Sequence, residues 1–305
     1  MISSVRLALA AALAALATAA APAHAALKVV TTTEGLAALA REVGGDRVEV
    51  QALSRGVQDP HFVDANPILA VKLRNADLLV DVGLELESGW LPPLVTQSRN
   101  AGIQPGGPRR LTAAASVALL DLPTGPVDRS RGDLHPGGNP HFLTDPRRAL
   151  QVAQAIAAKL AELDPAGADA YAARTADLGR RLQADLARWK AELAPFAGRK
   201  VLTHHRTLSY LFDWTGLATA GELEPRPGTP PPPAHLSSMV AVARREGVKA
   251  ILVEGYYDPR SAELVSRLSG AKVVVLPGDV GGDPAARTYE AYVDLVVRRL
   301  VEALR

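Results

Sequence analysis

Two segments of the chain place a histidine directly after a proline and before a phenylalanine. The first reads QDPHFVDAN and contains His61, and the second reads GNPHFLTDP and contains His141. Each histidine is expected after a loop and just before a helix. The proline restricts the backbone in front of the imidazole, because its φ is fixed and it has no N–H. Both histidines are therefore candidate metal ligands, and the alternative for each is an ordinary structural or surface histidine.

Three more candidates follow predicted strands. His204 and His205 come directly after the strand KVLT, and Asp279 follows the strand KVVVLP in a glycine-rich turn that also contains Asp283. Because neighbouring residues leaving a strand point in opposite directions, only one of the two histidines should face a given cleft. An aspartate that merely forms the turn is the ordinary alternative for Asp279. Three imidazoles and one carboxylate would satisfy tetrahedral Zn²⁺, whereas Mn²⁺ favours more oxygen ligands.

This ligand set favours carrying a metal over catalysis with it. Four protein ligands leave no coordination position for a water molecule, and a catalytic zinc site requires one. The sequence also contains no H-E-x-x-H motif, no G-x-S-x-G motif and no G-x-G-x-x-G motif. We therefore expect a protein that is not an enzyme, and a zinc-dependent periplasmic hydrolase is the alternative.

Composition narrows the classes further. The 305 residues include no cysteine, so a metal site must use nitrogen and oxygen ligands. The net charge of +2 gives no reason to expect a nucleic-acid partner. Arg6, the apolar run at 7–21 and the A-x-A pattern at 23–25 predict a signal peptide over residues 1–25, cleaved after Ala25. The apolar run is shorter than the roughly 20 residues that a membrane-spanning helix needs.

Predicted strands and helices alternate on both sides of one long helix. We expect an N-terminal α/β lobe over 26–165, a linking helix over 166–197 and a C-terminal α/β lobe over 198–305. The fold class is α/β, with two lobes that each have a mainly parallel sheet flanked by helices, joined by one long brace helix. Apolar residues on the brace recur every three or four positions: Tyr171, Thr175, Leu178, Leu182, Leu186, Trp189 and Leu193.

The order and spacing of these segments resemble a known family, the periplasmic metal-binding components of zinc and manganese ABC transporters (cluster A-I solute-binding proteins). The matching pieces run nearly end to end after the signal peptide: DPHFVDANP, ADLLVDVGLELESGW, GNPHFLTDP, the long helix, VLTHHRTLSYLFDWTGL, ILVEGYY and VVVLPGDVGG. The resemblance implies ligands at His61 and His141. It places the third ligand at His205, because Tyr210 follows five residues later. Manganese members carry a carboxylate at this third position, so a histidine there favours zinc.

The fourth ligand implied by the resemblance is Asp279, and Asp283 is its rival in the same turn. Many zinc members carry a long histidine-rich loop before the second ligand. In this chain the surface loop predicted at 121–140 holds a single histidine, His135, which we expect at most to touch incoming ions. Asp59, Asp64 and Glu254 are candidates for fixing imidazole tautomers, with ordinary surface carboxylates as the alternative.

The function implied is a periplasmic, high-affinity receptor that binds Zn²⁺ as its transported ligand and passes it to an ABC-type inner-membrane permease. The cytoplasmic ATPase of that transporter would be an indirect partner, and the receptor itself is expected to be a monomer. Affinity should fall as the pH drops through the histidine range near 6.5, because the ligands must be deprotonated. A metallochaperone or adhesin of the same fold is a further alternative.

Overall fold

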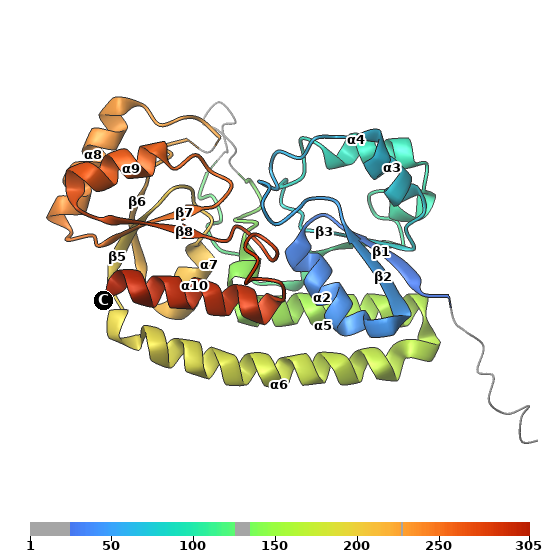
Figure 1. Cartoon of the computed structure of the whole chain (residues 1–305). Helices are drawn as coiled ribbons and strands as arrows, with labels where there is room; N and C mark the ends of the chain where they lie inside the picture. Colours follow the sequence, from blue (N-terminus) through green and yellow to red (C-terminus); the bar gives the residue numbers. More distant parts are fainter. Residues whose placement is uncertain (1–24, 126–134, 227) are drawn as a thin grey trace, which may run out of the picture.

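The computed structural model shows two α/β lobes side by side over one long helix (Figure 1). It describes residues 25–125, 135–226 and 228–305. The predicted signal peptide therefore lies outside the described residues, apart from Ala25. Among the residues that are described, no helix is both long enough and apolar enough to cross a membrane.

The first lobe is built on a parallel sheet with the strand order β2-β1-β3-β4. Its strands are β1 (Leu27–Thr31), β2 (Val48–Ala52), β3 (Leu78–Asp81) and β4 (Arg110–Thr112). Its helices are α2 (Glu34–Gly44), α3 (Pro67–Arg74), α4 (Leu91–Ser98) and α5 (Pro146–Leu163). One apolar cluster joins the sheet to α2 and α5, and a second joins it to α3 and α4. Both faces of the sheet are therefore covered, as parallel sheets require.

The second lobe repeats this strand order as β6-β5-β7-β8, again with every pair parallel. Its strands are β5 (Lys200–Thr203), β6 (Ala218–Glu222), β7 (Ala250–Glu254) and β8 (Lys272–Leu276). Its helices are α7 (Ser209–Thr215), α8 (Pro233–Arg245), α9 (Arg260–Ser269) and α10 (Tyr289–Leu304). The central strand β7 is buried at all five positions, which explains its apolar run from Ala250 to Val253; only its last residue, Glu254, is polar.

Side-chain caps define where the helices next to the loops begin. The Thr33 hydroxyl accepts a hydrogen bond from Leu36 N at the start of α2. Asp145 accepts one from Arg147 N, and Pro146 occupies the first turn of α5, where its missing N–H costs no hydrogen bond. The start of α5 in turn fixes the end of the segment that carries His141.

The brace helix is α6 (Ala168–Leu193), which runs beneath both lobes and contacts α2, α5 and α10 (Figure 1). The predicted apolar stripe is buried along its whole length except at Leu186, which is partly buried. At the rim, Arg181 forms ion pairs with Glu42 on α2 and with Glu290 on α10. The helix therefore binds elements of both lobes.

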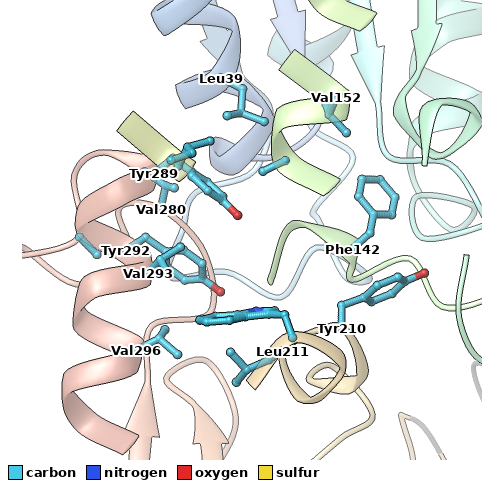
Figure 2. Close-up of a cluster of buried hydrophobic side chains, with 14 of the residues drawn as sticks. Leu39, Phe142, Val152, Tyr210, Leu211, Val280, Tyr289, Tyr292, Val293 and Val296 are labelled. Atoms are coloured by element: carbon cyan, nitrogen blue, oxygen red, sulfur yellow. The ribbon is translucent and has the colours of Figure 1, made fainter. Parts of the chain in front are cut away.

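The two lobes also share one hydrophobic core. Figure 2 shows part of it, where side chains from α2 and α5 meet others from α7 and α10. The labelled members are Leu39, Phe142, Val152, Tyr210, Leu211, Val280, Tyr289, Tyr292, Val293 and Val296. Two hydrogen bonds cross the same junction, from Trp214 Nε1 to the Thr144 carbonyl and from the Tyr289 hydroxyl to the Leu143 carbonyl. This continuity resists hinge motion between the lobes, and the fold class is the one predicted.

Candidate metal centre

Three of the predicted ligands meet at the junction between the lobes. Ring nitrogens of His61, His141 and His205 all lie within 4.8 Å of one another. His61 comes from the loop after β2, His141 from the segment before α5, and His205 from the end of β5. The carboxyl ends of the strands face this junction, which is where parallel sheets bind their ligands.

The orientation of His61 is set by Asp59. Asp59 Oδ1 accepts hydrogen bonds from the backbone N–H of His61 at 3.0 Å and from its ring Nδ1 at 2.7 Å. The intervening loop is tied down by Trp90, whose indole N–H donates to the Pro60 carbonyl. Because a carboxylate only accepts, Nδ1 carries the proton and the Nε2 lone pair faces the other imidazoles.

The same arrangement recurs at His141 with an amide in place of the carboxylate. Asn139 Oδ1 accepts from the His141 backbone N–H at 2.9 Å and from ring Nδ1 at 2.8 Å. The amide nitrogen of Asn139 donates to the Arg206 carbonyl, which fixes the direction of the amide. His141 Nε2 is buried and has no hydrogen-bond partner. An unpaired buried lone pair is costly, and a bound cation would satisfy it.

His205 is the member of the His204–His205 pair that faces the other rings. Its Nδ1 donates to Glu224 Oε2 at 3.0 Å. His204 instead stacks on Tyr257 at 4.3 Å, and its Nε2 lies 3.5 Å from Glu224 Oε1. Burial raises the pKa of Glu224, but the hydrogen bonds from the two histidines outweigh burial and lower this pKa to about 2. Glu224 is therefore a carboxylate at neutral pH and orients both rings.

Asp279 does not join the three imidazoles. Its carboxylate accepts hydrogen bonds from Gly35 N at 2.9 Å and from Val280 N at 2.8 Å. Gly35 lies in the first turn of α2, where backbone N–H groups are free to bind a carboxylate. Burial raises the pKa of Asp279 to about 6. Asp279 and His141 both line a cavity of about 70 Å³ between the lobes, so the carboxylate lies near the rings without being grouped with them.

The other carboxylates that the sequence offered as candidates, apart from Asp59, do not contact the imidazoles. Asp283, the rival to Asp279, pairs with Arg299 and caps Ala285 N. Glu254 is buried and accepts from the Thr207 hydroxyl, not from an imidazole. Asp64 is exposed. Of the three candidates for fixing a tautomer, only Asp59 holds an imidazole, and sequence reasoning missed the other two acceptors, Asn139 and Glu224.

The two missed acceptors, Asn139 and Glu224, differ in whether the sequence could have indicated them. Asn139 stands two residues before His141, just as Asp59 stands two residues before His61, so a shared Asx-Pro-His pattern was readable in the sequence. Glu224 follows β6, an edge strand whose sequence, ATAGE, carries little apolar signal. Its partnership with His205 depends on β5 and β6 lying side by side, which only the tertiary structure provides.

The centre is chemically suited to a borderline-soft divalent cation. Burial and the nearby histidines lower the pKa of His141 well below its usual value of 6.5. The ring is therefore neutral at neutral pH and ready to coordinate. Neutral imidazole nitrogens suit zinc and other late transition metals, whereas manganese prefers carboxylate, carbonyl and water oxygens. A pocket of about 660 Å³, lined in part by His61, His204 and His205, reaches the rings from one side.

Two parallel-sheet lobes joined by a brace helix, with imidazoles from both lobes meeting at their junction, define a receptor for a metal ion. The family model described as "ZnuA: Zinc-uptake complex component A periplasmic" matches residues 29–303, and the chain belongs to this family. The resemblance inferred from the sequence motifs is confirmed. The family consists of substrate-binding proteins of ABC transporters and not of enzymes, which also confirms the expectation that this chain is not an enzyme.

Individual relatives bind different metals according to their names. The chain is 28% identical to "High-affinity zinc uptake system protein ZnuA" of Paracoccus denitrificans, covering 90% of this chain and 91% of the relative. It is 25% identical to "Manganese ABC transporter substrate-binding lipoprotein PsaA" of Streptococcus pneumoniae, covering 81% and 78%. A solved structure, "Crystal structure of 138-173 ZnuA deletion mutant plus zinc bound", matches 91% of this chain and 98% of its own, with a TM-score of 0.76 at 23% identity. That likeness confirms the fold.

Proposed function

We propose that this chain is a periplasmic receptor that binds Zn²⁺ with high affinity and delivers it to the permease of an ABC transporter. The observation that carries the proposal is the convergence of three imidazoles, whose ring nitrogens lie within 4.8 Å of one another. Each ring has its Nδ1 on an oxygen acceptor, which leaves Nε2 for an ion. Membership of a zinc-uptake family and the names of the relatives supply the transporter context.

His61, His141 and His205 are the proposed ligands, each through Nε2. With the Nδ1 protons already placed, the rings need little reorganisation to bind an ion, and such preorientation raises ligand basicity. Zn²⁺ is favoured over Mn²⁺ because these donors are all nitrogen. Asp279 remains the proposed fourth ligand: each of its oxygens accepts one backbone N–H, which leaves a lone pair that can face an ion.

Capture and release should depend on loops more than on lobes. The brace helix and the shared core oppose a rigid-body hinge, whereas His61 and His141 lie on connecting segments. Export by the predicted signal peptide would place this receptor outside the inner membrane. Mass spectrometry of the secreted chain should give a mature protein that begins at Ala26.

Zinc binding is tested by metal content and chelator-competition titration of the mature protein. We expect one equivalent of zinc in the wild type and an affinity at least about 10-fold lower in His205→Ala. His235→Ala is the matched control, because the His235 Nε2 faces the Glu222 carbonyl, away from the centre. Equal affinities for wild type and His205→Ala would remove the proposed site.

Delivery needs a separate measurement. Cells that lack the gene should take up radioactive zinc slowly at limiting concentration, and the wild-type chain should restore uptake. The His205→Ala chain, exported to the same level, should not. Restoration by that variant would dissociate the metal centre from transport.

A further inference from the structure

Asn139, which orients the ring of His141, has both protons of its side-chain amide placed by other groups. The amide nitrogen donates to the Arg206 carbonyl at 2.8 Å and to Asp121 Oδ2 at 2.9 Å. Its Oδ1 accepts from the backbone N–H and the ring Nδ1 of His141. Because the amide has only two protons, it cannot turn without losing one of these partners. The direction of the His141 ring therefore depends on groups outside its own segment.

The backbone of Asn139 is held as firmly as its side chain. The Tyr210 hydroxyl donates to the Asn139 carbonyl at 2.7 Å and accepts from Leu120 N at 3.0 Å. Asn139 N in turn donates to the Leu120 carbonyl at 2.9 Å. Tyr210 is fully buried in the shared core (Figure 2), and the Arg148 guanidinium lies 4.6 Å from its ring centroid. Burial raises the pKa of Tyr210, so its hydroxyl keeps its proton and stays a donor.

These contacts cross the junction between the lobes. Asn139 precedes α5 of the first lobe, whereas Tyr210 lies in the first turn of α7 in the second lobe. Arg206, whose carbonyl accepts from the Asn139 amide, directly follows His205. The segment that carries His141 is thus hydrogen-bonded to the segment that carries His205.

Ser209 adds a further link between the lobes. Its hydroxyl donates to Asp121 Oδ2 at 2.5 Å, and the same oxygen accepts from the Asn139 amide. Asp121 presents this oxygen from a backbone with a φ of 53°, a left-handed conformation that aspartate tolerates better than most residues. One carboxylate oxygen therefore joins a residue of each lobe.

The second lobe receives a matching contact from the first. Asp279 accepts a hydrogen bond from Gly35 N, in the first turn of α2. A Cβ atom at Gly35 would lie 2.5 Å from Asp279 Oδ1, so the glycine leaves room for the carboxylate. Each lobe thus holds a proposed ligand that the other lobe carries. If the lobes part, His141 and Asp279 lose their support together.

We propose that Tyr210, Ser209 and Asp121 form a latch through which the second lobe positions His141 for zinc. The inference rests on the proposed function and concerns how the ion is retained. The latch residues act through Asn139 and are positioning residues, not ligands. Zinc should be held tightly only while the lobes are docked, because the partners of an imidazole set its orientation and its tautomer. Weakening the latch should let the ion leave faster although every ligand is present.

The rate of zinc loss to an excess of chelator, followed by stopped flow, tests the latch. Tyr210→Phe keeps the ring and removes the hydroxyl, and it should lose zinc about 5-fold faster than the wild type, the size expected for one hydrogen bond. Tyr171→Phe is the matched control, because Tyr171 is also fully buried and its hydroxyl donates to Asp164 on the brace side of the first lobe. This control should lose zinc at the wild-type rate.

Ser209→Ala provides a second, milder variant. It removes the hydrogen bond to Asp121 from a half-buried position and should also speed zinc loss. Ser238→Ala, which removes an exposed hydroxyl that donates to the His235 carbonyl on α8, is its control and should change nothing. If Tyr210→Phe does not fold, the Ser209 pair decides.

Two further readouts separate positioning from a general loss of stability. In the zinc-free protein, nitrogen-15 NMR of the His141 ring should show one tautomer, protonated at Nδ1, in the wild type and in Tyr171→Phe, and a mixture of both tautomers in Tyr210→Phe. In a double-mutant cycle, Tyr210→Phe should add little to the effect of Asn139→Ala, since the hydroxyl acts through Asn139.

The outcomes distinguish the latch from the function on which it rests. A Tyr210→Phe protein with the wild-type rate and a single tautomer would overturn the latch and leave the receptor intact. Equal acceleration in Tyr210→Phe and Tyr171→Phe would also overturn it, because the effect would then come from stability alone. A wild type that binds no stoichiometric zinc would overturn the proposed function, and the zinc-free tautomer would still decide whether Tyr210 positions the ring.

Discussion

Asp59 binds His61 through a single carboxylate oxygen, which accepts from the backbone N–H at 3.0 Å and from the ring Nδ1 at 2.7 Å. Asn139 does the same for His141. In both segments a proline separates the acceptor from the histidine, so the backbone is held while the side chain closes the loop. The repeated Asx-Pro-His sequence therefore fixes the orientation of an imidazole and leaves its Nε2 available to coordinate an ion.

Removing the Asp59 acceptor should weaken zinc binding without removing a ligand. We expect Asp59→Ala to lower affinity by about 10–100-fold, because the His61 ring loses both its orientation and its tautomer. Asp59→Asn keeps an accepting oxygen and should lose less. Chelator-competition titration measures both, with the exposed Asp64→Ala as control. An Asp59→Ala protein with wild-type affinity would show that His61 is oriented by something else.

Glu224 should matter for zinc although it does not belong to the proposed ligand set. Its carboxylate accepts from His205 Nδ1 and is close to His204 Nε2, so Glu224→Ala frees both rings. We expect an affinity loss of about 10–100-fold in Glu224→Ala and a smaller loss in Glu224→Gln, which can still accept from His205. Glu222→Gln, which alters an outer ion pair with Arg206, is the comparison. If all three titrate alike, Glu224 has no part in positioning His205.

Zinc should stabilise the folded chain by mass action. An ion that binds only the native state at 100 times its Kd adds about 2.7 kcal/mol to the free energy of unfolding. Scanning calorimetry with and without excess Zn²⁺ should therefore show a rise in Tm on zinc addition. A chelator should reverse this rise. His141→Ala should remove this rise, since its buried Nε2 has no other partner. A rise of equal size in that variant would place the bound ion elsewhere.

The brace helix should couple the two lobes into one folding unit. Trp189 is fully buried in the core shared by both lobes, and its indole N–H donates to Asp294 on α10. Trp189→Ala should cost about 3–5 kcal/mol, and Trp189→Phe, which keeps most of the packing, clearly less. Urea unfolding followed by circular dichroism should give a single transition in the wild type. Two separated wild-type transitions would mean that the lobes unfold independently.

Glu87 should make the protein less stable as the pH rises. Burial and the charge of Asp81 raise the pKa of Glu87 from 4.5 to about 7. The folded state then holds a proton that the unfolded state has released between these values. Stability should therefore fall from pH 4.5 to about 7, by up to about 3 kcal/mol.

Replacing Glu87 isolates this dependence. Glu87→Gln cannot ionise, so urea unfolding of the variant across the same pH range should show a shallower fall in the free energy of unfolding than the wild type. Glu302→Gln, on the exposed face of α10, serves as the matched control. Identical slopes for wild type and Glu87→Gln would mean that this carboxyl is already ionised near pH 5 in the folded protein.

Local sequence was sufficient for most of the fold. Each buried parallel strand is a short apolar run, and the brace shows a single stripe from Tyr171 to Leu193, so periodicity alone located them. The short edge strands β4 and β6 were not located. Their sequences, RLT and ATAGE, carry little apolar signal, unlike those of the other two edge strands, β2 (VEVQA) and β8 (KVVVL).

For the metal centre, the sequence by itself determined which histidines could serve and how two of them are held. Asp59 and Asn139 act on His61 and His141 from two residues away, and contacts of that range are encoded locally. Only the tertiary structure decided the rest: it brought Glu224 to His205, turned the Leu84 carbonyl toward His135 and left the Asp279 carboxylate on the first turn of α2. These partners are 19, 51 and 244 residues apart along the chain, and whether such groups meet depends on how the strands and helices pack.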